Sequence, residues 1–228
     1  ARNIIIATDG VFSMDGHIAH LPELTRLADR FDALVMVDDC HATGHIGPGG
    51  RGTGALHGVG GRIDILTGTY GKTLGGAMGG FIAARRSEID LLRQRARPYL
   101  FSNALAPSVC GAALEAIRIA RSAEGDALRA RLVDNAARFR TGMAAAAFTL
   151  KPGDTPIIPV MLGDATLAGE FAARMLDHGV YVVGFSYPVV PLGSARIRTQ
   201  MSAGHSRDDL DRAIAAFATV GRELEVIR

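Results

Sequence analysis

The chain has 228 residues, of which 48% are hydrophobic and 21% charged, so it can bury the core of one large or two small domains. Its 25 basic and 23 acidic residues nearly cancel, and we therefore expect neither a nucleic acid nor a membrane surface as a partner. No apolar run reaches the roughly 18 residues that a membrane-spanning helix needs. Two cysteines do not make a disulfide framework, which favours a reducing, cytoplasmic setting.

Strand-like and helical patterns alternate in the first half of the chain. Leucines at near-helical spacing predict a helix over residues 21–31, with Pro22 in its first turn. Ser87, followed by Asp90, predicts a capping box that starts a helix ending near Arg95. Short apolar, β-branched runs predict strands over residues 4–8, 34–37, 63–67 and 80–84. This alternation is typical of a layered α/β domain with mainly parallel strand pairing.

The second half becomes alanine-rich from Pro107 and predicts a smaller α+β domain. Gly125 is expected to separate its first two helices, and Gly179 to end the third. Ser206, with Asp209 three residues later, is expected to start the last helix. The first three helices are expected over residues 109–123, 126–146 and 165–178. Strands are expected over residues 157–162, 180–183 and 195–200.

Lys72 lies in a glycine-rich loop that directly follows the apolar run at residues 63–67. A lysine amine forms a Schiff base with an aldehyde only when it is unprotonated, so it needs a site that lowers its pKa. The glycines let the backbone pack against a flat ring and a phosphate, and Thr69 adds a hydroxyl for phosphate oxygens. A surface lysine in a flexible loop is the alternative. A nucleotide-binding P-loop is excluded, because Leu66 occupies the position of that motif's first glycine.

Asp38 ends the second apolar run, where a carboxylate points into the crevice in which open α/β sheets bind ligands. A carboxylate that faces a pyridinium nitrogen and a lysine that forms a Schiff base are what a protein needs to hold pyridoxal phosphate. Asp38 and Lys72 together therefore predict a pyridoxal-phosphate site. His41, three residues beyond Asp38, could reach the same ligand or could satisfy backbone carbonyls in its loop. For Asp38 the alternative is a carboxylate that caps the following turn.

A metal site is a second possibility for the same segment. Its members would be Asp38, Asp39, Cys40, His41 and His45. However, residues adjacent along a strand point to opposite faces, and the Cys-x-x-Cys spacing of common metal sites is absent. We therefore expect no metal.

Two arginines in the second half are candidates for substrate binding. Arg196 and Arg198 lie on the expected strand at residues 195–200, and alternation places both side chains on one face. An arginine fork binds a carboxylate in bidentate fashion, which is how Arg196 could hold an amino-acid substrate. A solvated, charged face is the alternative for either arginine.

These residues together resemble the α-oxoamine synthase family of pyridoxal-phosphate enzymes, within the fold-type I aminotransferase-like group. The motifs that carry the resemblance are Val37-Asp38-Asp39-Cys40-His41-Ala42-Thr43-Gly44, Gly49-Gly50-Arg51-Gly52, Thr67-Gly68-Thr69-Tyr70-Gly71-Lys72 and Gly75-Gly76. Similarity to one member of the family extends over residues 97–103, 159–164 and 184–203.

The resemblance implies an α/β fold in two parts. Residues 1–107 would be the C-terminal part of the large, mostly parallel-sheet domain that binds pyridoxal phosphate. Residues 108–228 would be a linking helix and the small C-terminal α+β domain. Family members are much longer at the N-terminus, so we expect this chain to be the C-terminal piece of a longer protein.

The resemblance also implies a role for each matching residue. Lys72 would hold the cofactor aldehyde and later move the α-proton, while Asp38 would pair with the pyridine nitrogen and His41 would contact the ring oxygen. Arg196 would hold the substrate carboxylate. The other cofactor-binding residues implied are Ser13, Asp39, Cys40, Thr69, Tyr70 and Gly71 and, reaching the phosphate of the partner subunit in a homodimer, Ser102 and Asn103.

The reaction implied by the most similar member interconverts glycine and acetyl-CoA with 2-amino-3-oxobutanoate and CoA, a step of threonine breakdown. Two alternatives remain. The chain could belong to another α-oxoamine synthase, of the 8-amino-7-oxononanoate or 5-aminolevulinate type, which uses a different acyl-CoA. It could also be a non-catalytic scaffold that keeps the fold without the chemistry.

Overall fold

The computed structural model describes residues 3–228, which divide into two compact units. Unit 1 contains the described residues up to Phe12 together with Ile18–Ala127. Unit 2 contains Ser13–His17 and Leu128–Arg228. The division falls later than the expected boundary between residues 107 and 108, because helix α5 (Pro107–Ala120) groups with unit 1. How these units correspond to the domains of a longer protein stays a prediction.

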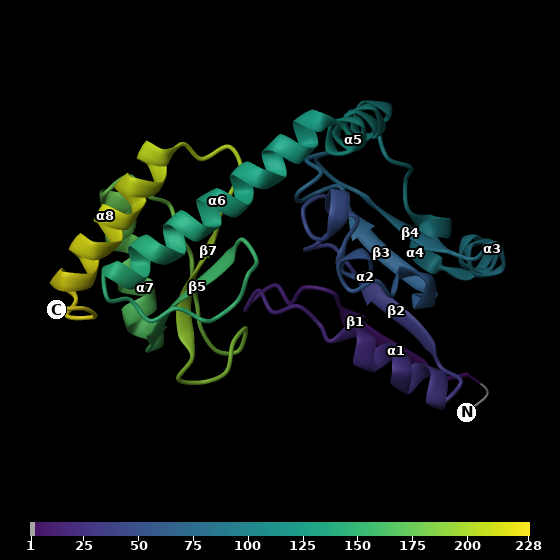
Figure 1. The fold of residues 1–228 in the computed structure, drawn as a ribbon, viewed down its shortest axis with the longest axis horizontal. Helices are drawn as coiled ribbons and strands as arrows, with labels where there is room; N and C mark the ends of the chain where they lie inside the picture. Colours follow the sequence, from purple (N-terminus) through teal and green to yellow (C-terminus); the bar gives the residue numbers. More distant parts are fainter. Residues whose placement is uncertain (1–2) are drawn as a thin grey trace. The chain divides into compact units, whose positions relative to one another are not determined.

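A four-stranded sheet forms the centre of unit 1, in the order β1-β2-β3-β4 (Figure 1). Its strands are β1 (Ile5–Asp9), β2 (Leu34–Asp38), β3 (Ile65–Thr69) and β4 (Gly80–Ala84). The first three pair in parallel, and β4 runs antiparallel to β3. In this register Asp38 lies between Asp9 on β1 and Thr67 on β3. The sheet therefore gathers polar side chains where its parallel strands end.

Helix α1 (Leu21–Arg30) connects β1 to β2. Helix α2 (Thr53–Leu56), with the 3-10 turns η1 (Pro48–Gly50) and η2 (Gly60–Arg62), connects β2 to β3. The helices that follow β4 in this unit are α3 (Arg86–Arg95), α4 (Arg97–Phe101), α5 and the first turn of α6 (Ala123–Ala145). Helix α1 buries Leu21 and Ala28 in a core that it shares with Val35 and Val37 of β2. This core fixes β2, the strand that ends at Asp38.

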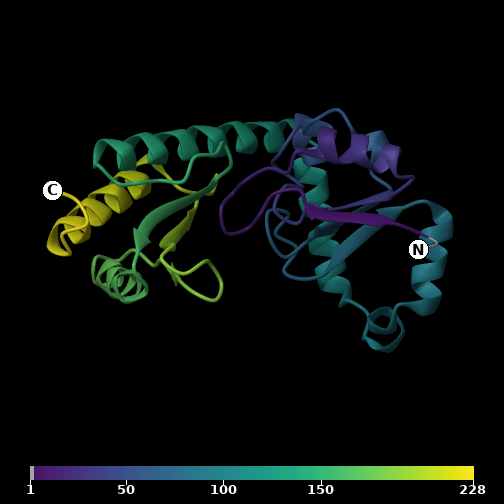
Figure 2. The same ribbon diagram turned by 90° about the horizontal axis from the view of Figure 1, so that it is seen from below.

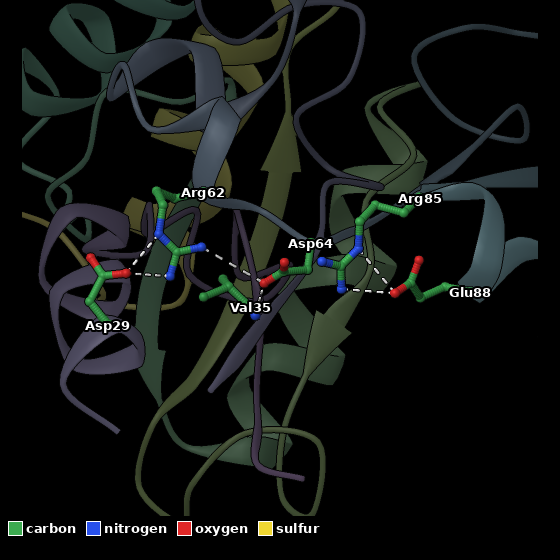
Figure 3. A network of polar contacts seen from close by, with 6 residues as sticks. All are labelled: Asp29, Val35, Arg62, Asp64, Arg85 and Glu88. Atoms are coloured by element: carbon green, nitrogen blue, oxygen red, sulfur yellow. Dashed lines mark hydrogen bonds and ion pairs between the residues drawn. The ribbon is translucent and has the colours of Figure 1, made fainter. Parts of the chain in front are cut away.

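A polar network holds the beginnings of β2 and β3 near α1 (Figure 3). The carboxylate of Asp64 accepts a hydrogen bond from the backbone N–H of Val35 at 2.8 Å. Arg62 pairs with Asp29 of α1 at 2.5 Å and lies 4.0 Å from Asp64. Because Arg62 and Asp29 are largely exposed, we expect this pair to orient the segment more than it stabilises the fold.

The sequence predicted the four strands of unit 1 but shifted some of their limits. Strand β1 runs from Ile5 to Asp9 rather than over residues 4–8, and β3 runs from Ile65 to Thr69 rather than over residues 63–67. The predicted capping box of α3 is wrong, because Arg85 is the N-cap and Ser87 lies inside the helix. The Ser87 hydroxyl donates to the Glu88 carboxylate, which also accepts from Arg85. The helix is therefore started by an ion pair rather than by a serine cap.

Unit 2 contains a three-stranded antiparallel sheet in the order β5-β7-β6. Its strands are β5 (Ile157–Gly163), β6 (Gly184–Phe185) and β7 (Ala195–Gln200). The rest of α6, together with α7 (Ala165–Asp177) and α8 (Arg207–Glu223), forms one hydrophobic core with this sheet (Figures 1 and 2). Phe217 is its centre, with ring centroids 5.4–6.0 Å from those of Phe139, Phe148 and Phe171.

Two predictions for the second half of the chain are wrong, and one is confirmed in detail. Residues 180–183 do not form a strand, because the N–H of Val180 closes the end of α7 by bonding to Met175. Gly125 lies inside α6 rather than between two helices. The capping box of α8 is present, with Ser206 and Asp209 bonding reciprocally. The α/β fold class is confirmed.

Candidate active site

Asp38 is the central acidic residue of unit 1. Its carboxylate accepts a hydrogen bond from the backbone N–H of Cys40 at 2.8 Å, which turns the chain sharply after β2. Burial would raise the pKa of Asp38, but hydrogen bonding from Cys40 and the positive charge of Lys72 outweigh it and lower the pKa below its ordinary value. Asp38 is therefore ionised near neutral pH and can pair with a cationic ring nitrogen.

Asp9 is a second carboxylate that the sequence analysis missed. It ends β1 in register with Asp38, which ends β2. Burial raises the pKa of Asp9, the negative charge of Asp38 raises it further, and Lys72 partly opposes both. The signal was available, because both aspartates directly follow apolar runs of neighbouring parallel strands.

Lys72 lies in the loop between β3 and β4, three residues after Thr69. Its side chain is exposed and, among the described residues, makes no hydrogen bond or ion pair. Its positive charge nevertheless helps to lower the pKa of Asp38 and partly offsets the raised pKa of Asp9. Lys72 is thus an amine beside two carboxylates with no permanent partner.

The backbone of the Lys72 loop is closed by its own hydrogen bonds. The N–H of Gly75 donates to the carbonyl of Lys72 at 3.0 Å, and the N–H of Gly76 donates to Tyr70 at 2.6 Å. The Thr69 hydroxyl donates to Gly79 at 3.1 Å and accepts from the N–H of Gly71. Gly75 has a φ of 61°, in the left-handed region that glycine adopts without strain. The loop therefore has a defined shape.

Thr67, on β3 next to Asp38, has a buried hydroxyl oxygen with no hydrogen bond of ordinary geometry. It still lies close enough to Asp38 to help lower the pKa of that carboxyl. A buried hydroxyl that lacks a full partner costs free energy, and such groups are commonly satisfied by a ligand. Thr67 is therefore a polar group available to a ligand bound over Asp38.

The turn that follows β2 is built around Asp39, which is 1% exposed. Its carboxylate accepts hydrogen bonds from the backbone N–H of Thr53 at 2.8 Å and from the Thr53 hydroxyl at 2.6 Å. The position of a Cβ atom at Gly10 or Gly52 would collide with this carboxylate. Asp39 therefore holds the end of β2 to the loop before α2, with Gly10 packed against its carboxylate, and its assignment to the cofactor stays a prediction.

The other site residues of unit 1 predicted from the sequence are His41, Cys40, Ser102 and Asn103. His41 lies in the turn after Asp39 and is partly buried. Burial raises the pKa of the Cys40 thiol to about 11, with the Asp38 carboxylate adding to the effect, so the thiol stays protonated. Ser102 and Asn103 follow α4 and are exposed. Their expected contact with a partner subunit stays a prediction.

Arg196 and Ser13 belong to unit 2. Arg196 is 1% exposed, and its guanidinium donates to the carboxylate of Asp15 and to the carbonyls of Ser194 and Met14. Asp15 also pairs with Lys151 at 2.9 Å. Burial would raise the pKa of Asp15, but the hydrogen bonds and positive charges of Lys151 and Arg196 outweigh it and lower that pKa. The sequence could not reveal this pairing, since 181 positions separate Asp15 from Arg196.

Arg198 differs from Arg196 in having no carboxylate partner among the described residues. Its guanidinium donates to the side chain of Gln200 at 2.8 Å and lies 5.8 Å from the ring centre of Phe185. It has no carboxylate partner among the described residues, and burial lowers its pKa. It also lines a cavity of about 580 Å³ in unit 2, together with His178, His205 and other residues. Both arginines therefore keep donors without a carboxylate partner among the described residues, Nη2 in Arg196 and most of the guanidinium in Arg198.

Residues 3–228, which the structure describes, contain neither a metal-ligand cluster nor a membrane-spanning helix. No group of three or more His, Cys, Asp or Glu side chains is arranged to hold a metal ion. Within the same residues, each helix is too short or too polar to cross a bilayer.

Known proteins resemble this chain over its whole length. It is 55% identical over 227 residues to the 2-amino-3-ketobutyrate coenzyme A ligase of Escherichia coli, covering 100% of this chain and 56% of that protein. The human mitochondrial protein of the same name is 52% identical over 218 residues, with 96% and 52% covered. The 8-amino-7-oxononanoate synthase of Thermoanaerobacter pseudethanolicus is 45% identical over 223 residues, with 98% and 56% covered.

The fold matches solved structures equally well. The serine palmitoyltransferase of Sphingomonas wittichii superposes with a TM-score of 0.93 at 32% identity, covering 99% of this chain and 56% of that one. The serine palmitoyltransferase of S. paucimobilis, solved with bound PLP and myriocin, gives a TM-score of 0.91 at 34% identity, with 98% and 56% covered.

The chain thus spans about half the length of the curated relatives it matches. These relatives confirm the resemblance inferred from the motifs around Asp38 and Lys72. The family model for aminotransferase class I and II matches residues 1–217. The chain belongs to the aminotransferase class I and II family.

Proposed function

We propose that the complete protein is a pyridoxal-phosphate-dependent acyltransferase, glycine C-acetyltransferase, also called 2-amino-3-ketobutyrate coenzyme A ligase. It would interconvert glycine and acetyl-CoA with 2-amino-3-oxobutanoate and CoA. The observation that carries the proposal is the placement of an unpartnered amine, Lys72, beside an ionised carboxylate, Asp38. The 55% identity to the Escherichia coli ligase supports this reaction.

The residues of unit 1 fit the cofactor. Asp38 is held ionised, which suits a protonated pyridine nitrogen, and Thr67 offers a buried hydroxyl without a full partner. Lys72 has no competing ion pair among the described residues and can reach an aldehyde. When bound, pyridoxal phosphate supplies an electron sink that stabilises negative charge at the substrate Cα.

Each side chain then has a distinct task. Lys72 would hold the cofactor aldehyde and would move the substrate Cα proton; a positioned proton acceptor is typically worth about 10²–10⁴ in rate. Asp38 would keep the ring nitrogen protonated, and His41 would contact the ring oxygen. By the family resemblance, Thr69, Tyr70 and Gly71 would bind the phosphate, and Ser13 and Cys40 would also belong to the cofactor site. Asp39, next to Asp38 in the chain, is itself held by two hydrogen bonds from Thr53.

For the substrate carboxylate we propose Arg198 in addition to the arginine chosen from the sequence. Arg196 already holds the partly exposed carboxylate of Asp15 through Nη1, while its Nη2 makes no hydrogen bond among the described residues. Arg198 offers a guanidinium without a carboxylate partner among the described residues. Arg196 therefore remains a prediction, and its contacts favour a role in holding Asp15.

Three further parts of the proposal rest on the family resemblance. The protein would be a homodimer in which Ser102 and Asn103 reach the phosphate bound by the partner subunit. Its reaction would serve threonine degradation to glycine. Its location would be cytoplasmic, as the cysteine content favours.

An acyl-CoA panel tests the proposal. The complete protein would be supplied with glycine and with CoA esters of increasing chain length, and CoA release would be measured. We expect acetyl-CoA to give the highest kcat/KM, and Lys72→Ala to lose turnover. Faster turnover with a long acyl chain would favour an 8-amino-7-oxononanoate type of synthase, the alternative that the 45% identical relative supports. No turnover with any ester would favour a scaffold.

A further inference from the structure

His45 is the one histidine of the candidate site for which neither the motifs nor the proposed reaction provides a task. It lies in the turn after β2, where the backbone N–H groups of Ala42 and Thr43 donate to the carbonyl of Asp39 at 2.9 and 2.8 Å. His45 itself donates its N–H to Ala42 at 3.2 Å. The position of its ring is therefore set by the turn that begins at Asp38 and carries His41.

The His45 ring makes a specific contact with the Lys72 loop. Its Nδ1 atom lies 3.1 Å from the hydroxyl oxygen of Thr73, the residue directly after Lys72. The adjacent backbone is equally close, because a Cβ atom at Gly44 would lie 2.9 Å from the Thr73 methyl carbon and 3.1 Å from a methyl carbon of Leu74. Two segments that are 28 residues apart in sequence thus meet at one hydrogen bond and one packed contact.

The imidazole is neutral where it makes this contact. Burial lowers the pKa of His45 to about 4, with the charge of His41 adding to the effect. At neutral pH His45 therefore brings a hydrogen-bonding group to the Lys72 loop without a second positive charge. A charged ring there would compete with the amine for Asp38 and Asp9.

We propose that His45 is a positioning residue, which through Thr73 holds the loop of Lys72 against the turn that carries Asp38 and His41. This inference rests on the proposed function in so far as Lys72 is the cofactor lysine. The contact itself is independent of that function. Without it, Leu74 still anchors the loop, but the segment from Tyr70 to Thr73 loses the hydrogen bond between Thr73 and His45 of the turn.

Hydrogen exchange in the complete, cofactor-free protein tests the contact directly. The amides of Gly75 and Gly76 close the Lys72 loop, so their exchange rates report its opening. Thr73→Val removes the hydroxyl and keeps the shape, whereas Thr73→Ser keeps the hydroxyl. A hydrogen bond of ordinary net strength predicts about two- to ten-fold faster exchange of both amides in Thr73→Val and His45→Phe, and little change in Thr73→Ser. His20→Phe, at an exposed histidine before α1, is the matched control.

Coupling and reactivity complete the test. The double variant His45→Phe/Thr73→Val should exchange no faster than either single variant, since one shared contact is lost. Pyridoxal phosphate followed by borohydride should label Lys72 more slowly in His45→Phe than in His20→Phe. Equal exchange in Thr73→Val and Thr73→Ser, or additive effects in the double variant, would overturn the proposal. If Lys72 of the unaltered protein takes no label, the proposed function fails, while the exchange comparison still decides the role of His45.

Discussion

Asp39 gives the sharpest test of how the site is supported, because it touches no expected substrate atom and yet lies next to Asp38. Replacing Asp39 with alanine removes both acceptors of Thr53, a residue with no exposed surface. The Thr53 N–H and hydroxyl would then be buried without partners, and each such group costs about 1–3 kcal/mol. We therefore expect Asp39→Ala to lower the free energy of unfolding by about 2–6 kcal/mol.

Urea unfolding of the complete protein measures this loss. Asp29→Ala is the matched control, because Asp29 pairs with Arg62 on the surface, with 59% of its side chain exposed. Such a pair is typically worth about 0–1 kcal/mol. Thr53→Val should fall between the two, since it removes the hydroxyl bond and leaves the backbone bond in place. An Asp39→Ala variant no less stable than Asp29→Ala would refute the view that buried Asp39 holds the turn.

The remaining predictions concern unit 2. Phe217→Ala should lower the free energy of unfolding by about 3–5 kcal/mol in thermal or urea melts, because the ring is 1% exposed and contacts three other phenylalanines; a loss below about 1 kcal/mol would argue against this core. Asp15→Asn should be less stable than the parent above pH 4. Because the folded-state pKa of Asp15 lies below its unfolded value, the difference should shrink as the pH falls through that range, and a difference that grows in acid would contradict the ion pair. Arg198→Lys should raise the KM for glycine with little change in melting temperature, whereas Arg196→Met should lower the melting temperature; the reverse pattern would restore Arg196 as the carboxylate-binding residue.

Local signals predicted the elements whose limits are set locally. Strands β4 and β7 were predicted with their observed limits, and α8 begins after the predicted N-cap residue, Ser206. Strand β3 was predicted to begin two residues early. Its start is set by pairing with β2, because Ile65 is the first residue of β3 that pairs, with Met36. The strand expected at residues 180–183 does not form for a similar reason, because the N–H of Val180 donates to the carbonyl of Met175 at the end of α7.

The candidate site divides in the same way. Asp38 and Lys72 were recognisable because each follows an apolar strand pattern, and the structure places their charges close together. Partners that are distant in sequence could not be inferred. Asp15 satisfies Arg196, and Thr73 contacts His45, only after the chain has folded. Long-range side-chain pairing therefore determines which arginine has a carboxylate partner and which loop is held against the turn after β2.

Covalent labelling of lysine is the most direct test of the central claim, and this chain suits it because Lys72 and Lys151 are its only two lysines. The complete protein would be incubated with pyridoxal phosphate, reduced with borohydride, digested and mapped by mass spectrometry. Lys151 is paired with Asp15 and serves as the internal control. The account predicts label on Lys72, none on Lys151, and no loss of label in Lys151→Arg. Label on Lys151 with Lys72 unmodified would contradict it.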